Sequence, residues 1–129
     1  ILGAALGIFI HSGQGCICGS RIFVQRGIFD QVVEGLAQVG RSMTQGPAHD
    51  PGNFIGPVVS QKQLTRIMVY IDEGKRDGVE VVSGGARLDR TGYFVPPTVN
   101  VIWSPRSRPS EIGALLSPMR AVPASIWNV

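Results

Sequence analysis

The chain has 129 residues, enough for one domain with a buried core. Its hydrophobic content of 43% and charged content of 16% exclude a disordered chain and a long coiled coil. The net charge is only +3, and the basic residues neither form a stripe nor alternate with aromatic residues, so we expect no nucleic-acid partner.

The chain begins with ILGAALGIFI, a segment that carries no charge. A helix that crosses a bilayer needs about twenty apolar residues, and a secretory signal starts with basic residues. The segment meets neither condition, so we predict a buried helix here and no membrane partner. Because it lacks an initiator methionine, we also expect the chain to come from a longer protein.

Residues 20–25, SRIFVQ, have the β-branched and aromatic content of a short strand. A helix is predicted next, because apolar residues recur at steps of three and four up to Met43. Gly35 and Gly40 weaken this helix, and a Gly-Pro pair at 46–47 ends it.

The stretch 46–59 contains three prolines and three glycines and is predicted to form a surface loop. Ser60 and Gln63 have the spacing of a capping box, which indicates that a second helix begins there. Its apolar face continues at helical spacing until Gly74 and Gly78 end it. We expect that face to lie on a sheet.

Two extended pieces follow, over residues 79–85 and 86–103. This order of strands and helices favours an α/β fold, a layered sheet with flanking helices. From Trp103 onward, prolines accumulate and no helical or strand period is evident. We therefore divide the chain into a domain over 1–102 and a poorly specified tail over 103–129.

The two cysteines, Cys16 and Cys18, lie in a glycine-rich stretch between two apolar runs. One intervening residue is too short for ordinary disulfide geometry, so we expect free thiols and a cytoplasmic location. A cysteine on a glycine-rich turn can face a cleft, with backbone N–H groups directed at a developing anion. Taken alone, however, a cysteine flanked by apolar residues is more often part of the core.

The segment FIHSGQGCICGSR closely resembles the cysteine active-site signature of the NAD(P)-dependent aldehyde dehydrogenase family. In that signature a Phe, three variable residues, Gly-Gln and one further residue precede the nucleophilic cysteine. Here those positions are Phe9, Gly13, Gln14 and Cys16. Other segments similar to the family are SRIFVQ, GPAHDPGNFIGPVVS, YIDEGKRDGVEVVSGG and GYFVPPTV, and the resemblance covers roughly residues 5–101.

This resemblance implies that residues 1–102 are part of an aldehyde dehydrogenase catalytic domain. Cys16 would attack the carbonyl of a small-molecule aldehyde, the thiohemiacetal would pass hydride to NAD or NADP, and the thioester would be hydrolysed to the acid. The parent enzyme is expected to be a homo-oligomer. Because the family's nucleotide-binding domain, general-base glutamate and oxyanion-binding Asn precede the signature, we expect this chain alone to be inactive.

The family also carries a Glu-Ile-Phe-Gly-Pro segment whose glutamate contacts the nicotinamide ribose. Glu111-Ile112-Gly113 resembles it without the Phe and the Pro, which makes Glu111 the candidate cofactor-binding residue. Since the resemblance fades after about Val101, we infer that the reading frame or assembly departs from the family there and that the tail is aberrant.

Two alternatives stay open: a non-enzymatic remnant that associates with other chains, and a small thiol or metal-binding module. His11, Cys16 and Cys18 would offer three metal ligands, whereas a closed structural site usually takes four, so no metal is expected. We interpret Cys18 as a packing residue, Arg21 as an ion-pair partner and His49 as solvated.

Overall fold

The computed structural model describes residues 1–102 and 112–116. In chain order the elements are helix α1 (Leu2–Phe9), the 3-10 turn η1 (Ile10–Gly13), strand β1 (Arg21–Gln25), the 3-10 turn η2 (Arg26–Ile28), helices α2 (Phe29–Ser42) and α3 (Gln61–Arg76), and strands β2 (Glu80–Ser83), β3 (Val99–Ile102) and β4 (Ile112–Leu116).

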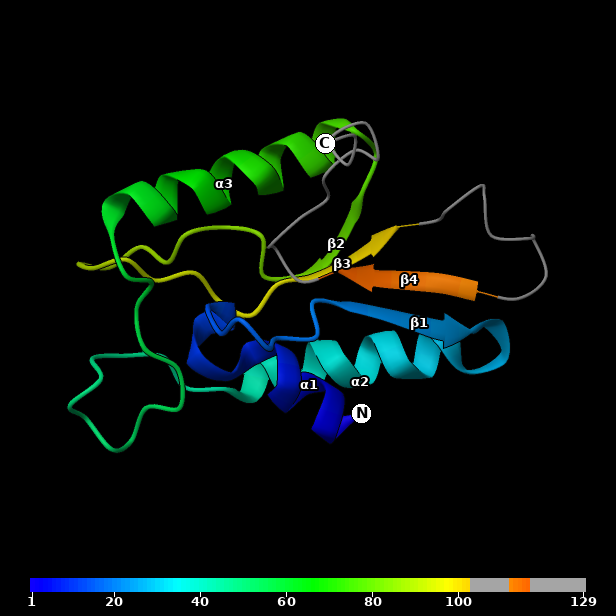
Figure 1. Cartoon of the computed structure of the whole chain (residues 1–129), viewed down its shortest axis with the longest axis horizontal. Helices are drawn as coiled ribbons and strands as arrows, with labels where there is room; N and C mark the ends of the chain where they lie inside the picture. The colour runs from blue at the N-terminus through cyan, green and yellow to red at the C-terminus, as the bar shows by residue number, and fades with distance from the viewer. Residues whose placement is uncertain (103–111, 117–129) are drawn as a thin grey trace.

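The four described strands form one sheet in the order β1-β4-β3-β2, and each neighbouring pair is antiparallel. Helices α1 and α2 lie on one side of this sheet and α3 lies toward the other side (Figure 1). The predicted α/β architecture, a layered sheet with flanking helices, is therefore confirmed.

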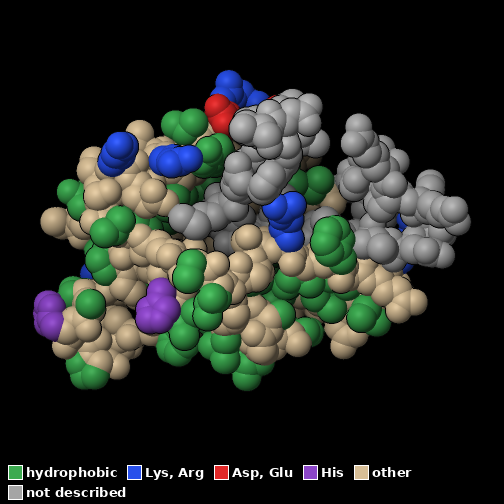
Figure 2. All heavy atoms as spheres, viewed as in Figure 1, with side chains coloured by type: hydrophobic (Ala, Val, Ile, Leu, Met, Phe, Trp, Pro, Cys, Tyr) green, Lys and Arg blue, Asp and Glu red, His purple; other side chains and the backbone are tan. Residues whose placement is uncertain are grey.

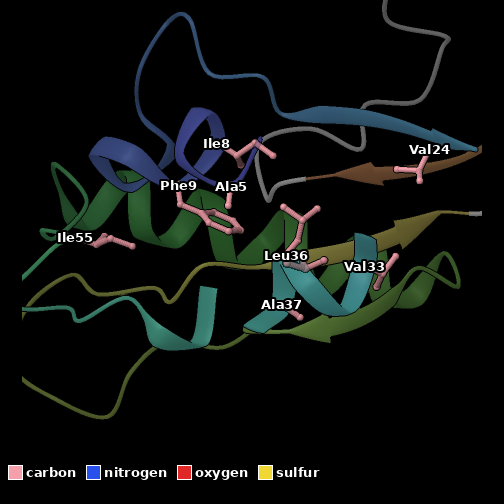
Figure 3. Packing of buried hydrophobic residues seen from close by; sticks show 9 residues of the cluster. Ala5, Ile8, Phe9, Val24, Val33, Leu36, Ala37 and Ile55 are labelled. Carbon is pink, nitrogen blue, oxygen red and sulfur yellow. The ribbon is translucent and has the colours of Figure 1, made fainter. Parts of the chain in front are cut away.

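The main core lies between α1, α2 and the sheet, where the apolar stripe of α2 faces inward. Leu36 is only 2% exposed, and Phe9 of α1 and Val24 of β1 belong to the same buried cluster (Figure 3). Gly40 permits this packing, because a Cβ there would come 3.1 Å from the Cβ of Pro97. The glycine that weakens α2 as a helix thus allows a close contact.

Helix α3 begins as the sequence predicts, since the Ser60 hydroxyl accepts a hydrogen bond from the Gln63 backbone N–H at 3.2 Å. The expectation that α3 lies on the sheet is wrong. Its buried residues form a second cluster with Val58 and Val95, which belong to the connecting segments before α3 and before β3. Among the described residues, side chains from these two irregular segments, and not strands, pack against the apolar face of α3.

Helix α2 and strand β3 are shorter than the sequence suggests. Helix α2 ends at Ser42, and Met43 already has an extended backbone with ψ of 117°. The loop over 46–59 is confirmed, with one isolated bridge between Gln45 and Ile55. Of the extended piece over 86–103, only Val99–Ile102 pairs as a strand.

The segment beyond residue 102 contributes β4, which lies between β1 and β3 in the sheet. Its register places Phe23 opposite Ala114 and Val101 opposite Leu115. A strand in this position differs from the poorly specified tail that the sequence suggests. The local sequence has no clear alternation there, so the pairing itself defines the strand.

Candidate functional site

Cys16 lies in a tight turn between η1 and β1. The backbone N–H of Cys18 donates a hydrogen bond to the Gly15 carbonyl at 3.1 Å, which closes the turn around Cys16 and Ile17. Cys16 is exposed, and Ile17 beside it is 92% exposed. Cys16 is therefore not a core residue of this chain, and its thiol is exposed.

Cys18 has a different environment, although one residue separates it from Cys16. It is half-buried, and its Sγ lies 3.2 Å from the point that a Cβ on Gly15 would occupy. A side chain at position 15 would thus press on this sulfur. The interpretation of Cys18 as a residue that packs within the turn agrees with this contact.

The backbone before the turn has an unusual conformation. His11, Ser12 and Gly13 have φ values of 53°, 58° and 70°, so three successive residues are left-handed. This conformation costs about 1–2 kcal/mol for each residue that carries a Cβ. The Ser12 hydroxyl donates a 2.7 Å hydrogen bond to the Gly56 carbonyl, which helps to hold the backbone in place.

Gln14, the glutamine of the Gly-Gln pair, connects two parts of the chain. Its amide oxygen accepts a hydrogen bond from the Val59 backbone N–H at 2.9 Å. Its amide nitrogen donates to the His11 carbonyl at 3.2 Å. At the base of the loop, the Gly19 N–H donates to the Gly7 carbonyl at 3.2 Å. The cysteine turn is therefore held by hydrogen bonds at its base and along one side.

Gln14 belongs to the signature, but the sequence indicates no hydrogen-bond partner for it. Nor does the sequence indicate that Ser12, Gly56 or Val59 belong to the site. The available signal was that both segments, the cysteine stretch and GNFIGPVV, resemble one family. Their contact in space follows from the fold and not from any local pattern.

A small cavity of about 30 Å³ lies next to this loop, lined in part by Phe9, Ser12, Gly13 and Val58. Cys16 does not line it. The cavity has room for about one or two water molecules, which is too small for an organic substrate.

The other candidate residues do not gather around Cys16. His11 and His49 are exposed, as is Arg21, which makes no ion pair with any of the residues that the structure describes. Within residues 1–102 and 112–116, no three His, Cys, Asp or Glu side chains are placed to hold a metal ion. These ranges contain no ion-pair partner for Arg21, so its interpretation as an ion-pair residue stays a prediction.

The glycines around the cysteines do not form a dinucleotide-binding turn. Such a turn follows a strand and opens a helix, so that the helix N-terminus faces the pyrophosphate. Gly13, Gly15 and Gly19 instead follow a helix and precede β1. The described residues therefore do not fit a nicotinamide cofactor here, and Glu111, the predicted cofactor-binding residue, lies outside them.

The surface has no concentrated charge on the face that Figure 2 shows, where the described Lys and Arg side chains are dispersed. None of the helices in the described ranges has both the length and the hydrophobicity to span a bilayer.

Comparison with known proteins gives a consistent result. The model of the "Aldehyde dehydrogenase family" matches residues 1–109. An aldehyde dehydrogenase from Emericella nidulans is 45% identical over 96 residues, which cover 74% of this chain and 19% of that protein. The NAD+ complex of the Bacillus cereus aldehyde dehydrogenase has a TM-score of 0.75 and 40% identity, over 77% of this chain and 20% of that chain.

A solved double mutant of Staphylococcus aureus betaine aldehyde dehydrogenase is also similar, with a TM-score of 0.72 and 36% identity over 75% of this chain and 20% of that one. That structure contains NAD+ and a cysteine modified by BME. The chain described here spans about a fifth of the length of the relatives it matches.

Proposed function

The chain belongs to the aldehyde dehydrogenase family, and on this premise we propose that Cys16 is the nucleophile with which the whole protein oxidises an aldehyde to a carboxylic acid. The observation that carries the proposal is the exposed thiol of Cys16 on the turn that follows the Gly-Gln pair. The position of Cys16 after the Gly-Gln pair supports it further.

In the proposed reaction, the Cys16 thiolate attacks the aldehyde carbon. A carbon–sulfur bond forms while the carbonyl π electrons move to oxygen, which gives an alkoxide. In this proposal the backbone N–H of Cys16 helps to hold that alkoxide. Loss of the former aldehyde hydrogen as hydride leaves a thioester, and water cleaves the thioester to release the acid and regenerate the thiol.

NAD or NADP is our proposal for the hydride acceptor of the whole protein, and the NAD+ complexes of two relatives support it. We assign the binding of this cofactor to residues beyond those described here, because the glycine turn has the wrong order of elements. The 129-residue chain alone is accordingly expected to oxidise no aldehyde.

Three further assignments are proposals for the whole protein. The substrate is a small-molecule aldehyde, in agreement with the description of the family. Homo-oligomeric assembly is an expectation from the family resemblance. A cytoplasmic location is supported by the two free thiols, which suit a reducing compartment.

The function is tested by transplanting residues 5–101 into the Bacillus cereus relative in place of its matching segment. We expect the chimera to reduce NAD+ in the presence of an aldehyde, and Cys16→Ser to abolish this activity. Cys18→Ser is the matched control and should retain it. If Cys16→Ser keeps activity, or if Cys18→Ser alone removes it, the assignment of Cys16 is wrong.

A further inference from the structure

We propose that Gln14 is a positioning residue for Cys16, acting through its side-chain amide oxygen as the acceptor for the Val59 N–H. The inference rests on the proposed function, since it explains how the nucleophile is held. Gln14 contacts no substrate in this assignment and acts only through the geometry of the turn.

The cysteine loop needs hydrogen bonds because core packing does not hold it. No residue from Ile10 to Phe23 is buried, whereas Phe9 before this stretch and Val24 after it both lie in the core. A loop without a buried side chain keeps one conformation only if polar contacts restrain it. Among the side-chain hydrogen bonds of this loop, those of Gln14 lie nearest in sequence to Cys16.

The segment over residues 56–59, to which Gln14 is hydrogen-bonded, is itself held in place. Ser12 and Gln14 bond to the backbone at Gly56 and Val59, so two side chains of the loop contact one short segment. Val58 within that segment is 3% exposed and packs under α3. Ser60 directly after it caps α3. The loop is thus tied to backbone that the second core cluster holds in place.

The two hydrogen bonds of Gln14 make different demands on the side chain. The bond from the Val59 N–H needs an acceptor and joins two distant segments at 2.9 Å. The bond to the His11 carbonyl needs a donor, is longer at 3.2 Å, and stays within the loop. Glutamate keeps the acceptor and loses the donor, so Gln14→Glu should preserve the positioning while Gln14→Met removes it.

The experiment measures the rate constants for alkylation of Cys16 and Cys18 by iodoacetamide in the 129-residue chain, with fragment-ion mass spectrometry to separate the two sites. In the folded chain Cys16 should react faster, because it is exposed and Cys18 is half-buried. Gln14→Met should lower the Cys16 to Cys18 ratio by about fivefold, toward the value in denaturant, as expected for loss of one hydrogen bond.

Gln14→Glu should keep the wild-type ratio, and so should Gln38→Met, the control at an exposed position of α2. The inference is overturned if Gln14→Met leaves the ratio unchanged, if Gln14→Glu changes it as much as Gln14→Met, or if Gln38→Met has the same effect. Circular dichroism identifies a variant that fails to fold.

If Gln14→Met does not fold, hydrogen exchange at the Val59 amide of the wild-type chain tests whether the Gln14–Val59 hydrogen bond forms. We expect protection, because Gln14 is the partner of this N–H on an exposed residue. Exchange at the rate of an unstructured peptide would overturn the inference. Alkylation and hydrogen exchange need no catalysis, so they are independent of the chimera experiment. If the chimera experiment contradicts the assignment of Cys16 as the nucleophile, these two measurements still test the Gln14–Val59 hydrogen bond.

Discussion

The amide oxygen of Gln14 lies 2.9 Å from the backbone nitrogen of Val59, a residue 45 positions later in the chain. This contact joins the cysteine turn to the segment that leads into α3. It connects two stretches that both resemble the aldehyde dehydrogenase family, and it leaves Cys16 exposed on a restrained turn. The structure therefore gives the Gly-Gln pair of the signature a physical role.

The left-handed backbone at His11 predicts that His11→Gly stabilises the chain. Glycine at φ of 53° avoids a cost of about 1–2 kcal/mol, which exceeds the unfolded-state entropy it adds, so the free energy of unfolding should rise by about 0.5 kcal/mol. His49→Gly is the control, because His49 is exposed without a positive φ. Urea titration should show a higher free energy of unfolding for His11→Gly only. An equal decrease for both variants would show that the backbone at His11 is not strained.

Leu36 tests the core between α2 and the sheet. It is 2% exposed, so Leu36→Ala should lower the free energy of unfolding by about 2–5 kcal/mol through lost burial and a cavity. Leu2→Ala, at a residue that is 60% exposed, should change it by less than about 0.5 kcal/mol. Similar urea midpoints for the two variants would show that α2 does not pack as described.

Gly84 tests the close approach of backbone segments before β3. Its φ is +73°, and a Cβ there would lie 2.5 Å from the Pro97 carbonyl oxygen. Gly84→Ala should therefore destabilise the chain by more than about 2 kcal/mol. A Cβ on Gly3 in α1 would have no heavy atom of another residue within 4 Å. Gly3→Ala should therefore stabilise the chain by about 0.5–1 kcal/mol. Thermal unfolding of both variants checks the opposite signs.

Ser60 tests the cap of α3. Because its hydroxyl accepts the Gln63 N–H, Ser60→Ala should cost about 1 kcal/mol of stability. Ser42→Ala is the control, since that hydroxyl only donates to the Val39 carbonyl near the end of α2, and it should cost less than about 0.5 kcal/mol. A Ser60→Ala variant as stable as the wild-type chain in denaturant would mean that the cap does not form.

Local signals in the sequence predicted much of the secondary structure. The uncharged start forms α1, and the Ser60 and Gln63 spacing marks the start of α3. The prolines and glycines of 46–59 mark a loop. Each of these features depends on residues close together in the chain, so the sequence contains the information directly.

Features that depend on distant residues could not be predicted in this way. The position of β4 between β1 and β3 pairs residues far apart in the sequence, and no local period indicates it. The cover of α3 by Val58 and Val95 follows from the path of two irregular segments. The left-handed backbone at His11 and Ser12 could not be predicted, because neither residue is a glycine. The sequence therefore predicts the position of the cysteine, but not the hydrogen bonds that hold its turn.

If Cys16 carries the substrate during turnover, the thioester can be trapped on its sulfur. The chimera is quenched with acid during reaction with an aldehyde and NAD+, and its peptides are sequenced by mass spectrometry. We expect an added acyl mass on Cys16 and an unmodified Cys18. An acyl group on Cys18, or turnover without any acylated cysteine, would contradict it.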